Sequence, residues 1–229
     1  MTRPQFPAFG PQGPGSRRRF FLIGNRLCID FANTIYPPAS GGALTCWGDL
    51  VAFFEAVGVL GPAHREHLTV LETSAPDTTA ATFRSALELR DALRKTLEAI
   101  ASGRSVLAAW VEPVNAVLRW TEGYDQLVPS GHPDQPWRLE LVVREHRLEW
   151  LLAAIARSAA DLVAEGPGAP VRKCASPACL LYFYDTSRTG RRRWCSMSVC
   201  GNRTKVAAHA RRLRARALRR KKKPGANRE

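Results

Sequence analysis

The sequence has no uninterrupted apolar run long enough to cross a membrane as a helix, which takes about 18 or more residues. Ser16 to Leu22 resembles the start of a twin-arginine export signal, but the apolar stretch that should follow is missing. Only Phe20 to Ile23 are uninterrupted, whereas an export signal needs roughly 7–15 apolar residues there. We therefore expect a cytoplasmic protein, in which thiols stay reduced.

Recognisable catalytic motifs are absent as well. The 5 histidines form neither an HExxH zinc motif nor part of a nucleophile triad, and no glycine-rich phosphate-binding loop occurs. We therefore expect no enzymatic activity, although an enzymatic or small-molecule-binding body stays open as an alternative.

Acidic residues are scarce in the last part of the chain. From Val171 onward, 18 Lys and Arg stand against 2 Asp and Glu, a net charge of +16. The first 170 residues carry 16 basic and 18 acidic side chains, a net charge of −2. This asymmetry indicates that the C-terminal part binds a polyanion. A tail that only improves solubility is the alternative, chiefly for residues 219–229.

Cysteine is also uncommon, and 4 of the 6 cysteines form one pattern, Cys174-x4-Cys179-x15-Cys195-x4-Cys200. Two close pairs joined by a spacer can present four sulfurs to the corners of a tetrahedron, the arrangement that zinc prefers. Four thiolates leave no open coordination position, so we expect one structural Zn²⁺. Two disulfides, a redox switch and an iron–sulfur cluster are the alternatives.

The spacer between the cysteine pairs predicts a β-hairpin. Leu180 to Tyr184 is typical of a strand, Asp185 to Gly190 of a turn, and Arg191 to Trp194 of a returning strand, with a helix after Cys200. This layout is that of a treble-clef-like zinc finger. A module this small needs its metal to fold, and we expect the preceding helical body to fold without it.

Residues 201–220 have the pattern of a basic amphipathic helix. Val206, Ala210, Leu213 and Ala217 form a narrow apolar stripe that can dock on the finger or the body. The arginines around it suit DNA better than RNA because a helix fits the major groove, although arginine-rich segments also bind RNA. An acidic protein partner is the alternative. The candidate nucleic-acid-binding residues are Arg188, Arg191, Arg192, Arg193, Arg203, Lys205, Arg211, Arg212 and Arg214.

The N-terminal body is expected to be mainly α, multihelical, with a small β element. Apolar residues at spacings of three and four predict the helices, with Thr45, Asp77 and Ser105 as their caps and Pro113 as a kink or break. The predicted helices cover residues 45–57, 62–71, 78–101, 105–118 and 147–165. The predicted strands cover residues 124–128 and 136–143, and residues 20–30 are expected to form a strand that leads into a turn or helix.

Three polar residues stand in apolar segments of this body. Asp30 and Asn33 could line a small-molecule pocket, or they could cap and turn the backbone. Arg157 precedes Asp161 by one helical turn and would add to such a pocket if it faced Asp30.

Several motifs resemble known families. The segment Gly190 to Met197 and the tetrapeptide Cys200-Gly201-Asn202-Arg203 closely resemble the CGNR zinc finger. Leu27 to Thr34 and Ile155 to Leu162 resemble the ABATE domain that usually precedes it. The resemblance implies a mainly helical N-terminal domain, a zinc finger and a role in stress-related transcription regulation.

We therefore expect a DNA-binding regulator whose body is a sensor or dimerisation domain, with a small-molecule effector or a second copy as its partner. It would associate with the nucleoid if it binds DNA. Arg203 would either contact phosphate or brace the finger, and Tyr182, Tyr184 and Trp194 would either stack on bases or pack in the core. The expected organisation is a disordered segment 1–16, an ABATE-like domain 17–166, a CGNR finger with its basic helix 171–218 and a disordered basic tail 219–229.

Overall fold

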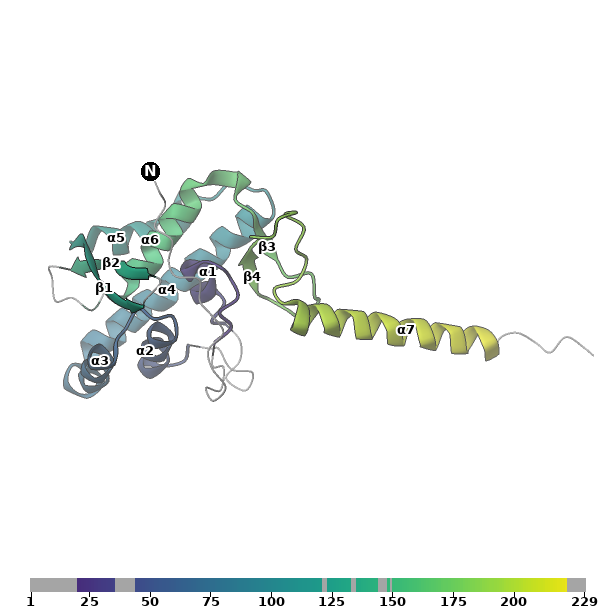
Figure 1. Ribbon diagram of the computed structural model, residues 1–229, viewed down its shortest axis with the longest axis horizontal. Coiled ribbons are helices and arrows are strands. Elements are labelled where there is room, and N and C mark those ends of the chain that lie inside the picture. The colour runs from purple at the N-terminus through teal and green to yellow at the C-terminus, as the bar shows by residue number, and fades with distance from the viewer. Residues whose placement is uncertain are drawn as a thin grey trace, which may run out of the picture.

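The computed structural model describes residues 20–35, 44–120, 123–132, 135–143, 148 and 150–221. Its body is mainly helical, and a small β-strand pair followed by a helix forms the C-terminal part (Figure 1). The predicted disordered segment 1–16 lies outside the described residues, as do residues 222–229. The elements of the body are α1 (Leu27–Ala32), α2 (Trp47–Ala56), α3 (Pro62–Ser74), α4 (Pro76–Ala101), α5 (Ala108–Trp120), β1 (Gly123–His132), β2 (Gln135–Val143) and α6 (Trp150–Ala164).

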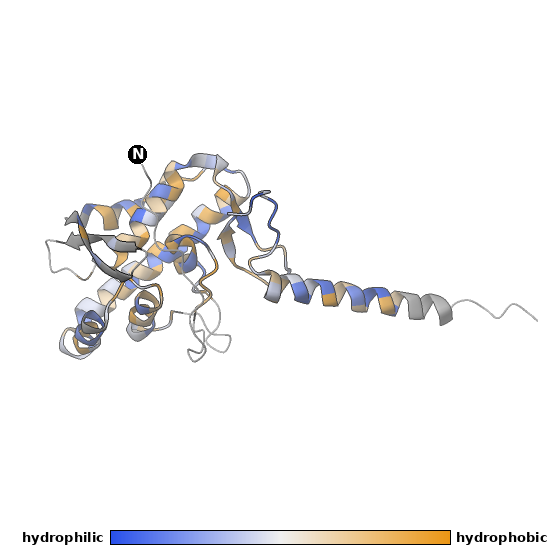
Figure 2. Ribbon diagram, viewed as in Figure 1, coloured by the Kyte–Doolittle hydropathy of each residue, from blue (hydrophilic) through white to orange (hydrophobic). Residues whose placement is uncertain are grey.

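Helix α4 is the centre of the body, and α1, α2, α3 and α5 all pack against it. Its residues Leu89, Leu93, Leu97 and Ile100 are buried at spacings of four, four and three, which places them on one face. Hydrophobic residues gather where the helices of the body face one another (Figure 2). The predicted helical pattern is therefore confirmed where its apolar periodicity is strongest.

The ends of the helices differ in part from the prediction. Pro62 starts α3 as expected, since a first helical residue needs no N–H. Pro76 starts α4 in the same way, so Asp77 lies inside the first turn and its prediction as a cap is wrong. Thr45 does not cap α2 either; its N–H donates to the Asp49 carboxylate over 2.7 Å. Helix α5 continues through Pro113 instead of dividing there.

Strands β1 and β2 form an antiparallel hairpin, as predicted, with a register shift between Pro129 and His132. For residues 20–30 the prediction of a strand is wrong, whereas the helix that was allowed to follow it is present. Residues 20–26 are irregular and Leu27 starts α1, all of whose residues are buried. The mixture of apolar and polar residues there belongs to an irregular segment followed by a buried helix.

The C-terminal part begins after a turn of 3-10 helix at Gly166–Gly168. Strand β3 (Val171–Lys173) pairs antiparallel with β4 (Tyr182–Tyr184). The prediction that residues 191–194 pair with residues 180–184 is therefore wrong: the second strand lies before the first cysteine. A π-helical turn at Met197–Gly201 leads into α7 (Asn202–Lys221), which projects away from the body (Figure 1).

Candidate metal centre and nucleic-acid interface

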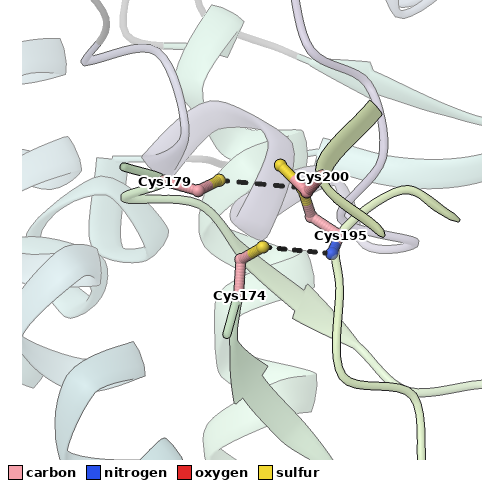
Figure 3. A group of neighbouring side chains, drawn as sticks. All are labelled: Cys174, Cys179, Cys195 and Cys200. Carbon is pink, nitrogen blue, oxygen red and sulfur yellow. Dashed lines mark hydrogen bonds between the residues drawn. The ribbon is translucent and has the colours of Figure 1, made fainter. Parts of the chain in front are cut away.

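The four predicted ligands lie together at the junction of four short segments. Cys174 follows β3, Cys179 precedes β4, Cys195 follows the long loop, and Cys200 lies in the turn before α7. All four are buried, and their sulfurs lie within 4.8 Å of one another (Figure 3). The Cys179 and Cys195 sulfurs are 3.7 Å apart, and those of Cys195 and Cys200 are 3.6 Å apart.

These separations fit a tetrahedral zinc ion. Sulfurs held at about 2.3 Å from tetrahedral zinc lie about 3.8 Å from one another, whereas a disulfide brings them to about 2.05 Å. Contact with the Cys179 thiol, burial and the neighbouring thiols raise the pKa of Cys195. A divalent cation bound to the sulfur would counteract this rise in pKa, because it favours the thiolate form of cysteine. The four cysteines thus fit one structural Zn²⁺ with a closed shell of ligands.

Two hydrogen bonds from neighbouring N–H groups contact the sulfurs of the predicted ligands. The Cys195 N–H donates to the Cys174 sulfur over 3.4 Å. An Arg203 N–H donates to the Cys200 sulfur over 3.3 Å. Hydrogen bonds from neighbouring groups orient metal ligands and lower the charge density on thiolates. Arg203 is therefore placed to brace the finger, which is one of the two roles that the sequence left open for it.

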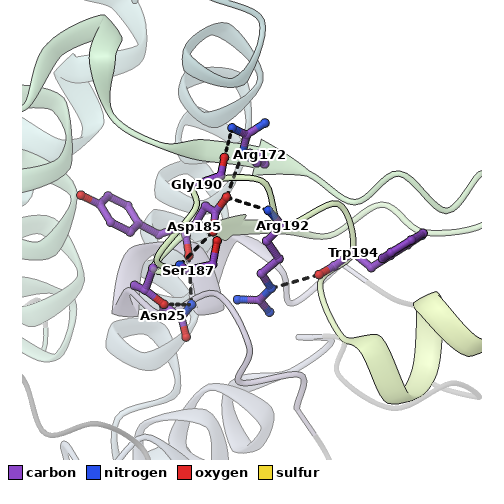
Figure 4. A network of polar contacts seen from close by, with 9 residues as sticks. Asn25, Arg172, Asp185, Ser187, Gly190, Arg192 and Trp194 are labelled. Atoms are coloured by element: carbon purple, nitrogen blue, oxygen red, sulfur yellow. Dashed lines mark hydrogen bonds and ion pairs between the residues drawn. The ribbon is translucent and has the colours of Figure 1, made fainter.

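The loop after β4 is organised by Asp185 (Figure 4). Its carboxylate accepts hydrogen bonds from the N–H groups of Ser187 and Arg192 and from the Arg172 side chain. Burial raises the pKa of this carboxyl, but the hydrogen bonds and the Arg172 charge outweigh it and hold the pKa below its ordinary value. Arg172 also donates to the Gly190 carbonyl over 2.6 Å. Hydrogen bonds thus hold the loop at both of its ends.

The predicted arginines of this loop have different surroundings. Arg192 faces inward, where its Nε donates to the Trp194 carbonyl over 3.0 Å and its guanidinium lies 4.4 Å from the Phe183 ring centre. It braces the finger in this position. Arg188 and Arg191 are exposed. Arg193 is exposed and lies over the Trp194 ring, 5.1 Å from its centre.

Helix α7 carries the remaining basic candidates on its surface. Lys205, Arg211, Arg212 and Arg214 are all exposed. The described side chains of the apolar stripe dock on neither the finger nor the body: Val206 is 68% exposed and Leu213 is 51% exposed. Hydrophilic and hydrophobic residues alternate along the helix (Figure 2). Helix α7 is thus a projecting basic rod anchored at its first turn, where Thr204 Oγ1 donates to the Cys200 carbonyl.

The three residues proposed to line a ligand pocket have separate settings. The buried Asp30 carboxylate accepts a hydrogen bond of 2.7 Å from the Gly24 N–H. Asn33 exchanges two hydrogen bonds of 2.9 Å with the backbone of Tyr182 in β4. Arg157 is half-buried on α6. Both Asp30 and Asn33 hold backbone segments together, and the pocket stays a prediction.

The sequence analysis did not predict the contacts between the body and the finger. Gly24 and Asn25 bind the backbone of Tyr184, with the Tyr184 N–H donating to the Gly24 carbonyl over 2.8 Å. Arg26 forms an ion pair of 2.6 Å with Glu165, whose other oxygen accepts from the Tyr184 hydroxyl. The pattern of β4 indicated a strand but not its contacts with the body, since Asn25 lies 159 positions away from Tyr184 in sequence.

Arg94 adds a further connection. It donates to the carbonyls of Ala32 in α1 and Leu180 in the finger, and its guanidinium lies 5.3 Å from the Tyr182 ring centre. Val171 and Tyr182 of the finger belong to the hydrophobic core of the body. Tyr182 therefore packs in the core, the more ordinary of the two roles left open for it.

Asp30 predicts a pH dependence of stability. Burial raises its pKa from 3.8 to about 7, so the folded chain binds this proton more tightly than the unfolded chain and its stability falls as the pH rises through that interval. Asp30→Asn keeps an oxygen that can accept from Gly24 but has no proton to lose. We expect a smaller loss of unfolding free energy for this variant between about pH 4 and 7 in urea titrations. Equal slopes for the two proteins would contradict the assignment.

A closed site of four thiols from which a basic helix emerges defines a zinc-finger protein. The model of the CGNR zinc finger matches residues 171–213, and that of the ABATE family, described as "Putative stress-induced transcription regulator", matches residues 25–166. Because the second match covers more than half of the chain, this chain belongs to the ABATE family. No curated protein matches the chain in sequence. None of the described helices is both long and apolar enough to span a membrane.

Proposed function

We propose that this protein is a DNA-binding transcription regulator whose zinc finger presents α7 to the double helix. One observation carries the proposal: a projecting helix with exposed Lys205, Arg211, Arg212 and Arg214 starts directly at the metal site. A helix of 20 residues spans about 30 Å and fits the major groove. The exposed loop arginines Arg188 and Arg191 supply further charge on the same finger.

The metal in this proposal supplies rigidity. Zinc fixes Cys200, and Cys200 is held to Arg203 and Thr204 in the first turn of α7. The helix therefore leaves the finger in a defined direction. Arg192 and Arg203 act as braces in this scheme, so the phosphate contacts are assigned to the other members of the predicted set, all of which are exposed.

The body is proposed to act as a sensor or dimerisation domain. Membership of a family described as a transcription regulator favours such a role of the body over an enzymatic role. An acidic protein partner remains the second candidate for α7, because the same exposed charge and the exposed Val206 and Leu213 would suit an acidic amphipathic surface.

The test is to remove charge from α7. Arg211→Gln, Arg212→Gln and Arg214→Gln together are expected to weaken binding to random duplex DNA about a hundredfold or more and to reduce the salt dependence by about three units of slope. Fluorescence anisotropy at several salt concentrations measures both quantities. The control removes three exposed charges from the body, Arg65→Gln, Arg84→Gln and Lys95→Gln, with the same change in net charge.

Three outcomes are decisive. Equal loss in the control would show that only net charge matters and would contradict a site on α7. Unchanged binding by the α7 variant would move the contact to the loop. Wild-type protein that binds no duplex DNA even at low salt would overturn the proposal and leave the acidic protein partner as the candidate. Competition by single-stranded or duplex RNA would show whether α7 prefers RNA to DNA.

A further inference from the structure

The hairpin β1–β2 forms a sheet of its own at the end of the body opposite to the finger (Figure 1). Within the part of the chain that the structure describes, each of its strands pairs only with the other. Each strand therefore keeps one edge of backbone N–H and C=O groups without a strand partner. Such an edge can accept a further strand in the antiparallel manner.

The two edges are not equivalent. On β1, Pro129 lacks an N–H and the register shifts between Pro129 and His132, and both features interrupt strand addition. On β2, residues 137–143 pair with β1 in unbroken register and contain neither proline nor glycine. The regular edge is therefore the one on β2.

The hairpin also exposes apolar side chains. Trp137 is 56% exposed and Leu127 is 62% exposed. Trp137 pairs with Pro129 and Leu127 with Leu139, so these four positions lie on one face of the hairpin. Trp137 lies on the strand with the regular edge, where an added strand would cover part of this exposed side chain, whereas Leu127 lies on the other strand.

The sequence of β2 is complementary to itself. A two-fold axis at Leu139 places residue 137 opposite residue 141 and residue 138 opposite residue 140 of the other copy. These positions hold Trp and Leu, and Arg and Glu. The axis thus gives two cross-strand pairs of opposite charge and two apolar pairs. An axis at residue 138 or 140 would instead place like charges opposite each other.

Across the hairpin, the register partners of positions 138 and 140 are Val128 and Gln126, which are uncharged. A second copy of β2 in the register defined by Leu139 would place an opposite charge across from each of the two positions. The charge pattern of the sequence therefore favours a second copy of β2 as the occupant of this edge, in this alignment.

We propose that β2 pairs antiparallel with β2 of a second copy about a two-fold axis at Leu139, forming a continuous four-stranded sheet in the order β1-β2-β2-β1. The proposal rests on the dimerisation role suggested above for the body and is independent of nucleic-acid binding. Because the hairpin lies opposite to the finger, the dimer carries its two basic helices at its outer ends (Figure 1).

Charge reversal tests the register. Arg138→Glu alone and Glu140→Arg alone each turn two opposite-charge pairs into two like-charge pairs, and each is expected to weaken dimerisation about tenfold to a hundredfold. Mixing these two variants restores both pairs in a heterodimer, and the double variant R138E/E140R restores them in a homodimer. Analytical ultracentrifugation of the full-length protein without DNA measures all four, and circular dichroism checks that each variant is folded.

Leu127→Lys is the control, because it alters the exposed face on β1 and leaves the β2 edge intact. It is expected to dimerise like the wild type. A monomeric wild type, or single reversals that dimerise normally, would overturn the proposal. Loss of dimerisation in Leu127→Lys without loss in the reversals would replace edge pairing by face-to-face packing. A monomeric protein that still binds DNA would overturn this interface alone and leave the regulator standing.

Discussion

Loss of the zinc ion is expected to destabilise the helical body together with the finger. Strand β4 is shared between them: its Tyr182 side chain packs in the core of the body, while its Phe183 side chain packs beside the ligand cysteines. Metal binding by small four-ligand fingers contributes on the order of 10 kcal/mol to folding. Without it, β4 has no support on the finger side, and the body loses Val171 and Tyr182 from its core.

The experiment compares Cys195→Ser with Cys46→Ser, since Cys46 is an exposed cysteine outside the metal site. We expect less than one zinc per chain and fast amide exchange in α1 for the first variant, and wild-type values for the second. Hydrogen exchange read by mass spectrometry resolves α1 from the rest of the body. Unchanged protection of α1 after zinc loss would show that the body folds independently, as the sequence alone had suggested.

Replacing Asn33 is expected to cost about 2–6 kcal/mol of unfolding free energy. Its side-chain amide satisfies both the N–H and the C=O of Tyr182, each over 2.9 Å and out of contact with water. Asn33→Leu has a similar volume but leaves both groups without a partner, and each such buried group costs about 1–3 kcal/mol.

Urea denaturation measures the effect, and Asn115→Leu on the exposed face of α5 is the matched control, expected within about 0.5 kcal/mol of the wild type. The Asn33 variant should also bind zinc less tightly, because the strand between the second and third ligands loses its anchor. Equal costs for the two variants would contradict the role assigned to Asn33.

Much of this architecture follows from local sequence. The four ligands were predictable because a zinc site needs thiols at close spacing, and α3, α4 and α6 because their apolar periodicity extends over several turns. The hairpin β1–β2 followed from two short strands around a loop rich in turn residues. Each of these features depends on residues that are near one another in the chain.

What could not be predicted depends on distant pairs. The partner of β4 is β3, where the sequence predicted no strand, and this pairing accompanies the approach of Cys174 to Cys195, which lies 21 positions further along the chain. The sequence could not decide between the two roles left open for Asn33, because a polar side chain in an apolar segment has the same pattern whether it faces a ligand or a peptide group. Arg192 could not be distinguished from its neighbours, since only the structure shows that it faces Phe183.

The pairing of Asn33 with Tyr182 has a consequence for how such chains arise by recombination. A side-chain amide and a peptide group offer the same donor and acceptor, so Asn33 pairs with Tyr182 of β4 as a residue of a neighbouring strand would. On the same strand, the Gly24 carbonyl accepts a hydrogen bond from the Tyr184 N–H. A finger transplanted to another protein would therefore carry an incomplete sheet. We therefore expect exchange of the finger between relatives to succeed only when the residues at positions 24–33 are exchanged with it.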